Sequence, residues 1–130
     1  MASTPQPATL TTAALLSGLA GFQTALAAGA PWGVASYGGG HRGRLPVGLR
    51  RTSGVAAVVY VAGAGCLVGR VGEPQVRRKG LAALTGVMAV GAVMNSVSRS
   101  KVERVWGPVC AATALAAWRA RDEQISRRES

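Results

Sequence analysis

The sequence holds few side chains that could make or break a covalent bond, and those few stand apart from one another. Cys66 and Cys110 are the two cysteines, so the chain has no CxxC pair. A thiol oxidoreductase needs two neighbouring thiols, and a zinc site needs clustered cysteine or histidine ligands. His41, the single histidine, has no serine, cysteine or carboxylate beside it. We therefore expect a protein that is not an enzyme and that holds no metal and no cofactor.

Three uncharged polar residues, Gln23, Tyr60 and Asn95, stand inside long apolar segments. A polar group buried among apolar atoms without a hydrogen bond is unfavourable, so each of these side chains needs a partner or a wet space. They could join neighbouring helices by hydrogen bonds, or they could line one polar cavity or pore. None of the three ionises near neutral pH, and the sequence therefore favours the structural role.

A glycine-rich stretch, Gly38-Gly39-Gly40, precedes Arg42 and Arg44. The backbone N–H groups of such a stretch, together with guanidinium groups, are suited to hold an anion. No Lys-Ser or Lys-Thr pair follows, so nucleotide binding is not indicated. A flexible connection is the simpler interpretation, and an anionic lipid headgroup is the anion that we expect if one binds.

Charged and apolar residues are separated along the chain, and this separation predicts the helices that carry these residues. The 130 residues carry a net charge of +10, yet 48% of them are hydrophobic and the mean hydropathy is +0.24. The first charged side chain is Arg42, and uncharged stretches then alternate with short basic clusters. A helix of about 20 residues crosses a hydrocarbon core of about 30 Å. We predict an all-α integral membrane bundle of four transmembrane helices, forming a single membrane domain, at residues 8–30, 52–69, 80–98 and 102–121.

The predicted spans leave a long connection at 31–51 and a C-terminal tail at 122–130. The basic clusters beside the spans suit anionic lipid headgroups, at about 1 kcal/mol per residue, whereas a nucleic-acid-binding protein would gather them on one surface. The two sides of the membrane receive nearly equal numbers of Lys and Arg, so the positive-inside rule favours neither orientation. We favour both termini in the cytoplasm, since Arg70 and Arg77-Arg78-Lys79 stand close to two span ends. A cleaved signal peptide is the alternative for residues 1–30, but no Lys or Arg precedes the apolar stretch.

Small residues recur at helical spacing in the predicted spans. Ser17, Gly21 and Ala25 follow one another every four residues, and Gly65 and Gly69 form a GxxxG pair. In lipid, helices associate through close approach at small residues of this kind. We therefore expect these two rows to lie at contacts between helices.

Three glycine-containing stretches lie at the borders of the apolar segments: GAPWG at 29–33, YGG with LP and arginine further on within 37–50, and NSVSRSKVERVWGPV at 95–109. They resemble a group of small bacterial four-span membrane proteins that is uncharacterised in activity. The resemblance implies four spans and no catalytic residue. It marks as positions of interest the residues Trp32, Gly33, Asn95, Ser96, Glu103, Arg104 and Trp106.

These features predict the class of protein but not a specific function. We expect a multi-pass protein of the cell membrane with a non-enzymatic, structural or accessory role in a membrane assembly, in contact with other membrane proteins or with a second copy of itself. The alternative is a small channel or transporter assembled as a dimer, because four short helices enclose little space by themselves. A soluble basic nucleic-acid-binding protein is the least favoured class, and we expect no nucleic-acid partner.

Overall fold

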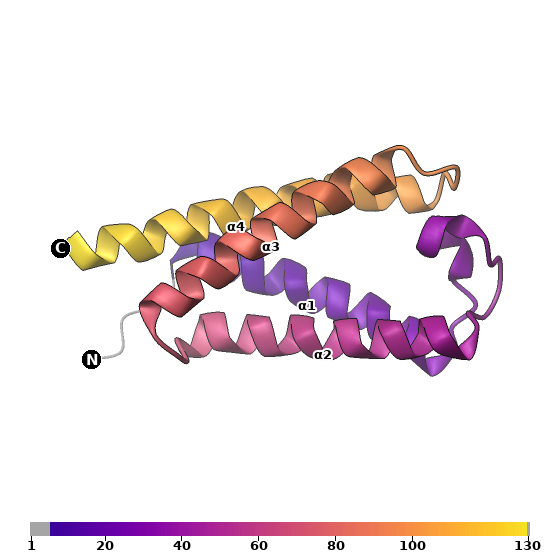
Figure 1. The fold of residues 1–130 in the computed structure, drawn as a ribbon, viewed down its shortest axis with the longest axis horizontal. Coiled ribbons are helices and arrows are strands. Elements are labelled where there is room, and N and C mark those ends of the chain that lie inside the picture. Colours follow the sequence, from indigo (N-terminus) through magenta and orange to yellow (C-terminus); the bar gives the residue numbers. More distant parts are fainter. Residues whose placement is uncertain (1–5, 130) are drawn as a thin grey trace.

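The computed structural model describes residues 6–129, and in this range the chain forms four long α-helices and no β-strand (Figure 1). The helices are α1 (Pro7–Ala28), α2 (Val47–Gly69), α3 (Pro74–Ser96) and α4 (Trp106–Glu129). Short 3₁₀ turns lie in two of the connections: η1 (Gly33–Ala35), η2 (Tyr37–Gly39) and η3 (Glu103–Val105). The predicted all-α class is confirmed.

Local sequence signals explain where several helices begin and end. Pro7 and Pro74 open α1 and α3, at a position where the missing N–H of proline leaves no helical hydrogen bond unmade. α1 stops at Gly29, whose φ of 103° lies in the left-handed region that favours glycine. The turn between α2 and α3 is closed by Arg77, which donates from Nη1 to the Arg70 carbonyl at 3.0 Å.

The helix boundaries differ from the predicted spans where the sequence is charged. α2 begins at Val47 and α3 at Pro74, so the basic residues before the spans 52–69 and 80–98 lie inside helices, and the connection predicted at 31–51 is shorter. Arginine and lysine are good helix formers, so they end an apolar stretch without ending a helix. α4 begins at Trp106 because η3 occupies 103–105, and the tail predicted at 122–130 is helical as far as Glu129. Residue 130 of that tail lies outside the described residues.

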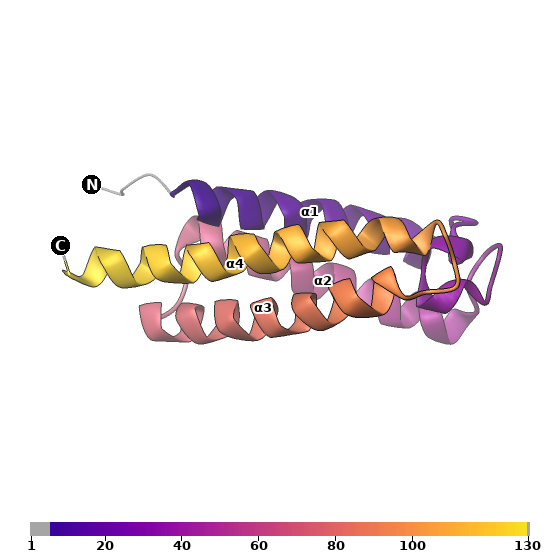
Figure 2. The ribbon, with the colours of Figure 1, turned by 90° about the horizontal axis from the view of Figure 1, so that it is seen from above.

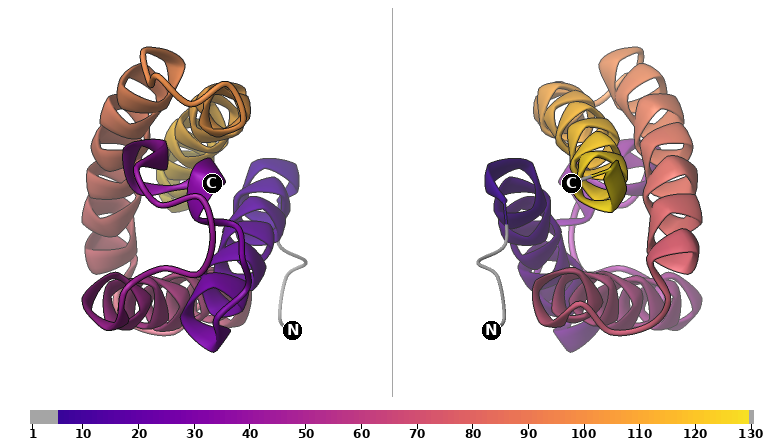
Figure 3. Two further views of the ribbon diagram at one scale, coloured as in Figure 1. Left: turned by 90° about the vertical axis from the view of Figure 1, so that its right-hand side faces the viewer. Right: turned by 90° about the vertical axis from the view of Figure 1, so that its left-hand side faces the viewer.

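Neighbouring helices run antiparallel and form an open bundle (Figures 1 and 2). α1 packs along α2, α3 along α4, and α1 along α4. α2 and α3 are joined by a short turn but separate from each other away from it (Figure 1). Residues 30–46 fold over one end of the bundle beside residues 97–105 (Figure 3), and we call this the connection end. The start of α1 and the last turns of α4 lie at the opposite end, the terminal end (Figure 2).

The core consists of leucine, alanine and methionine side chains on the inward faces of the four helices. Burial of such side chains contributes about 1.5–3 kcal/mol for each large one when the surrounding solvent is water. The buried cluster comprises Ala13, Leu16, Leu19, Ala64, Leu67, Leu81, Met88, Cys110, Ala117 and Ala120. α1 and α4 each supply three of these residues, and α2 and α3 supply two each.

The rows of small residues predicted at helix contacts do not lie there. Ser17 and Gly21 are exposed, and a Cβ added at Gly21 or Gly65 would have no atom within 4 Å. The contact between α1 and α2 uses Gly63 instead, where an added Cβ would lie 3.7 Å from Leu16. The leucines decide which face of each helix turns inward, so glycine spacing alone selected the wrong faces.

Two of the helices, α1 and α2, are long and apolar enough to cross a bilayer, judged by length and composition. Within their most apolar windows, 33% of the residues of α1 and 22% of those of α2 are buried in the bundle. The core helix of a soluble protein is mostly buried, whereas most residues of these two windows are not. Among the described residues, α3 and α4 are not apolar enough over a membrane-spanning length to pass the same test, because α3 begins with basic residues and α4 ends with them.

Candidate functional site

A buried carboxylate, Glu103, joins the two connections at the connection end. It lies in η3, and 6% of its surface is exposed. Its Oε1 accepts a hydrogen bond from the backbone N–H of Gly38 at 3.0 Å, and its Oε2 accepts one from the Ser98 hydroxyl. The bond to Gly38 ties the α1–α2 connection to the α3–α4 connection across 65 positions of sequence.

Ser100 makes a second tie between the same two connections. Its hydroxyl donates to the Val34 carbonyl and accepts from the Glu103 backbone N–H at 3.2 Å. Arg104 Nε donates to the Ser98 carbonyl at 2.7 Å. The Arg104 guanidinium therefore bonds within the α3–α4 connection. Together these bonds fix the position of Glu103.

Gly33 is required by the close packing of its connection. Its N–H donates to the Gly43 carbonyl at 3.0 Å, and a Cβ added at Gly33 would lie 2.0 Å from the His41 carbonyl oxygen. No other residue fits this position without moving the backbone. Trp32 beside it is about half exposed, and its ring stacks on Phe22 with centroids 6.1 Å apart.

Next to Glu103 the bundle contains a cavity of about 220 Å³. It brings together Gln23, Tyr60 and Asn95, which come from α1, α2 and α3, with Glu103 and Trp106. Of the other sequence-predicted positions, Trp32, Gly33 and Arg104 lie at the same end of the bundle but do not line it. The remaining lining residues are Leu19, Phe22, Ala35, Ser36, Tyr37, Val87, Met88, Gly91 and Cys110.

The three polar residues from the helices do not bond to one another. Asn95 donates from Nδ2 to the Cys110 sulfur at 3.5 Å, and thiol sulfur is a weak acceptor. The Gln23 Oε1 is buried without a hydrogen-bond partner among the described residues. No hydrogen bond joins the Tyr60 hydroxyl to another residue in that part of the chain either. The structure therefore places all three around one cavity and gives one of them an interhelical bond.

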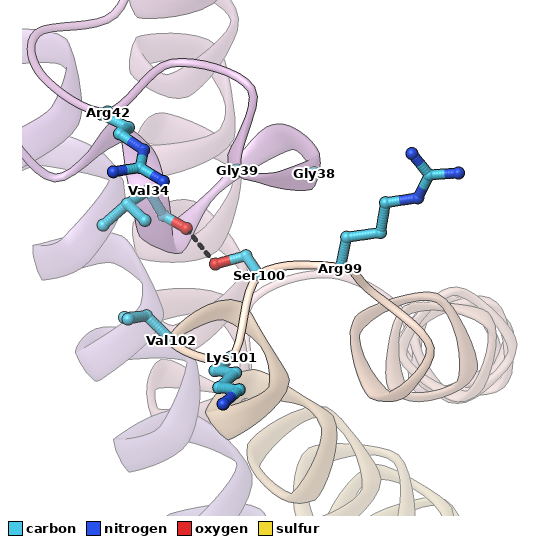
Figure 4. Close-up of a pocket in the computed structure, with 8 residues that line it drawn as sticks. All are labelled: Val34, Gly38, Gly39, Arg42, Arg99, Ser100, Lys101 and Val102. Atoms are coloured by element: carbon cyan, nitrogen blue, oxygen red, sulfur yellow. Dashed lines mark hydrogen bonds between the residues drawn. The ribbon is translucent and has the colours of Figure 1, made fainter.

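A second hollow at the connection end, about 570 Å³ in volume, is lined by Arg42, Arg99 and Lys101 (Figure 4). The Arg99 side chain extends away from the Gly38–Gly39 loop in this view, so the cationic groups do not converge on one point. Two of the three glycine N–H groups that could hold an anion are already used. Gly38 donates to Glu103, and Gly39 donates to the Ser36 carbonyl at 2.9 Å. The anion cradle that the sequence suggested therefore lacks two of its donors.

Sequence reasoning missed Glu123, which joins α4 to α1 at the terminal end. Its Oε1 accepts from the Ala8 N–H at 3.0 Å, and its Oε2 accepts from the Thr9 N–H at 3.2 Å and the Thr9 hydroxyl at 3.1 Å. The first N–H groups of a helix have no partner within the helix, so Glu123 caps α1 from another element. The sequence carries no signal for this pairing, because the residues are more than a hundred positions apart.

Comparisons of the chain with protein-family models, with curated proteins and with solved structures find no match. The resemblance to small bacterial four-span proteins therefore stays a prediction.

Proposed function

We propose that the chain crosses a bilayer four times and serves as a non-enzymatic, structural or accessory component of the cell membrane. The observation that carries the proposal is the outward face of α2 and α3. So many exposed valines on two long helices are unusual on a soluble monomer and are expected on helices that contact lipid tails. The side chains, each 59–68% exposed, are Val55, Val58, Val59, Val61, Val87, Val90 and Val93.

The arrangement of the bundle supports extending the crossing from α1 and α2 to α3 and α4. α1 and α2 have 22 and 23 residues, so each is about 33–35 Å long and matches a hydrocarbon core of about 30 Å. α3 runs beside α4, and α4 runs beside α1 (Figure 2). A bilayer around α1 and α2 would therefore surround the uncharged parts of α3 and α4 as well. The last turns of α4 extend past the other helices (Figure 1), so this end of α4 would lie beyond the apolar layer.

The basic residues of the chain support the same placement. Arg50 and Arg51 lie in the first turns of α2 at the connection end, and Arg77, Arg78 and Lys79 lie at the other end of the bundle. Cations at both ends of an apolar rod suit the two headgroup layers. A nucleic-acid-binding surface would instead need them along one face.

Single cysteines test the number of crossings. In a background with Cys66 and Cys110 replaced by alanine, cysteine is placed at Gly40, Gly72 or Lys101 and exposed to a membrane-impermeant maleimide. Four spans with both termini in the cytoplasm predict that Gly72 reacts only from the cytoplasmic side, and that Gly40 and Lys101 react only from outside. Reaction of Gly72 and Lys101 from the same side would contradict a crossing by α3. Release of the protein by a carbonate wash would favour the soluble nucleic-acid-binding class.

The cavity favours a second candidate function, a small channel or transporter assembled as a dimer. One copy holds about 220 Å³, which is too little for a continuous path across a bilayer, so a second copy would have to complete it. Flux of a small cation into proteoliposomes that is lost with Asn95→Leu would support this candidate. Liposomes that stay impermeable while a crosslinked dimer is present would count against it.

A further inference from the structure

The cavity beside Glu103 carries more negative charge and more acceptor capacity than the surrounding residues use. The Glu103 carboxylate receives hydrogen bonds from two uncharged donors, Gly38 and Ser98, and forms no salt bridge within the described part of the chain. A buried carboxylate without a cation beside it is unfavourable. The Gln23 Oε1 is buried without a donor among the described residues, and Gln23 lines the same cavity. A ligand that brings positive charge into the cavity would compensate the Glu103 carboxylate.

Aromatic side chains form much of the remaining wall. Phe22, Tyr37, Tyr60 and Trp106 line the cavity, and the rings of Phe22 and Trp106 lie with their centroids 4.4 Å apart. Aromatic rings attract cations, and quaternary ammonium groups are typically recognised by cages of such rings. Among the described residues, no lysine, arginine or histidine lines this cavity. An anion would therefore find no opposite charge there.

The volume of the cavity limits the size of the ligand. A volume of about 220 Å³ corresponds to roughly seven water molecules at about 30 Å³ each. A ligand of about seven non-hydrogen atoms would fill it. Leu19 and Met88 supply apolar wall that suits methyl groups, and the exposed side chains of Tyr37 and Val87 lie at the rim.

We propose that this cavity binds a small alkylammonium cation, with Glu103 as the opposite charge and Phe22, Tyr60 and Trp106 as the aromatic wall. The cation is either a free solute or the headgroup of a lipid, because the two present the same chemistry to these residues. The proposal does not depend on how many helices cross the membrane.

The test is a titration of the full-length protein, purified in dodecyl maltoside, with choline by isothermal titration calorimetry. The uncharged alcohol 3,3-dimethyl-1-butanol has the shape of choline without its charge and serves as the matched ligand. We expect saturable binding of choline and binding of the alcohol that is weaker by at least about tenfold. Equal binding of the two ligands, or no saturable binding of choline, would overturn the proposal.

Two pairs of variants locate the site. Glu103→Gln is expected to weaken choline binding by at least about tenfold, whereas Glu73→Gln removes the same charge from an exposed turn and should leave it unchanged. Tyr60→Phe keeps the ring and should keep the affinity, whereas Tyr60→Leu should weaken binding by about 2- to 30-fold. The Tyr60 hydroxyl makes no hydrogen bond to another described residue, so this second pair decides the question even if Glu103→Gln fails to fold. Wild-type affinity in Tyr60→Leu would contradict the aromatic wall.

A competition experiment distinguishes the two sources of the cation. Dihexanoyl phosphatidylcholine is added below its micelle concentration while choline is titrated. Displacement of choline by this lipid would show that the site accepts a lipid headgroup. Binding of choline without displacement would assign the site to a free solute, and both results support an alkylammonium site.

Discussion

Each end of the bundle contains one glutamate that joins distant parts of the chain, and the two carboxylates are satisfied differently. At the terminal end, Glu123 accepts three hydrogen bonds from the first turn of α1, where the helix N-terminus also supplies partial positive charge. At the connection end, Glu103 accepts bonds from Gly38 and Ser98 and borders a cavity that holds the unpartnered oxygen of Gln23. The fold compensates the first carboxylate more completely than the second.

This difference separates a carboxylate that serves the fold from the one to which we assign a ligand. Both residues are glutamates, and both bridge segments that are far apart in sequence. What distinguishes Glu103 is its surroundings: it is buried, and among the described residues no lysine or arginine lines the cavity beside it, whereas Arg119 lines the hollow beside Glu123. Four substitutions test the comparison, beginning with the one that should have the largest effect.

Gly33→Ala should disrupt the connection end and lower the free energy of unfolding by about 3 kcal/mol or more. The added Cβ would lie 2.0 Å from a backbone oxygen of residue 41, and a backbone atom cannot move aside as a flexible side chain can. Gly40→Ala is the matched control, since no atom lies within 4 Å of a Cβ there and its φ is −70°. Thermal unfolding in detergent measures both variants, and equal midpoints would show that residues 41–43 do not pack on Gly33.

Glu123→Ala should lower the free energy of unfolding by about 2 kcal/mol, because it leaves the first N–H groups of α1 without their acceptor. Choline affinity should not change, since Glu123 lies at the opposite end from the cavity. Glu73→Ala removes an equal charge from an exposed residue and is the control for net charge. A loss of choline binding in Glu123→Ala with the fold intact would break the distinction between the two ends.

Gln23→Leu should raise the free energy of unfolding by about 1 kcal/mol. It removes a buried acceptor that has no partner among the described residues and puts an apolar side chain of similar size in its place. The measurement is again the unfolding midpoint in detergent. A fall in stability of similar size would mean that water in the cavity donates a hydrogen bond to the Gln23 oxygen. The Gln23 oxygen would then give no support to a ligand in the cavity.

Gly65→Leu should change stability by less than about 0.5 kcal/mol, since Gly65 faces outward with no atom within 4 Å. Gly63→Leu is its counterpart two residues away, where the larger side chain would meet Leu16 and should cost about 1–3 kcal/mol. The order of the two unfolding midpoints is the readout. A reversed order would restore the GxxxG pair as the contact face of α2.

The sequence predicted the fold where composition over a long stretch decides the structure. The uncharged runs 8–30 and 52–69 supply most of α1 and α2, as their length and apolar composition predicted. Helix ends were less predictable, since the basic residues before α2 and α3 continue the helix instead of stopping it. Helix faces were wrong at Gly65, because leucines set the inward face.

Much of the candidate site could not be predicted, because it depends on pairs of residues far apart in the chain. The resemblance marked Glu103, and the polar residues Gln23, Tyr60 and Asn95 were visible inside apolar segments. Their meeting around one cavity depends on the rotation of three helices, which sequence spacing does not determine. The contacts of Glu123 with Thr9 and of Gly33 with residue 41 likewise follow only from the packed bundle.

The central claim is that the valine faces of α2 and α3 meet lipid and not water. Nitroxide spin labels at Val58 and Val90, both exposed and near the middle of the apolar parts of their helices, measure this directly in proteoliposomes. The account predicts relaxation by molecular oxygen, which concentrates in the hydrocarbon, and protection from a water-soluble nickel complex, while a label at Val71 in the α2–α3 turn is reached by nickel. Relaxation of the Val58 and Val90 labels by nickel to the same extent as the Val71 label would contradict it.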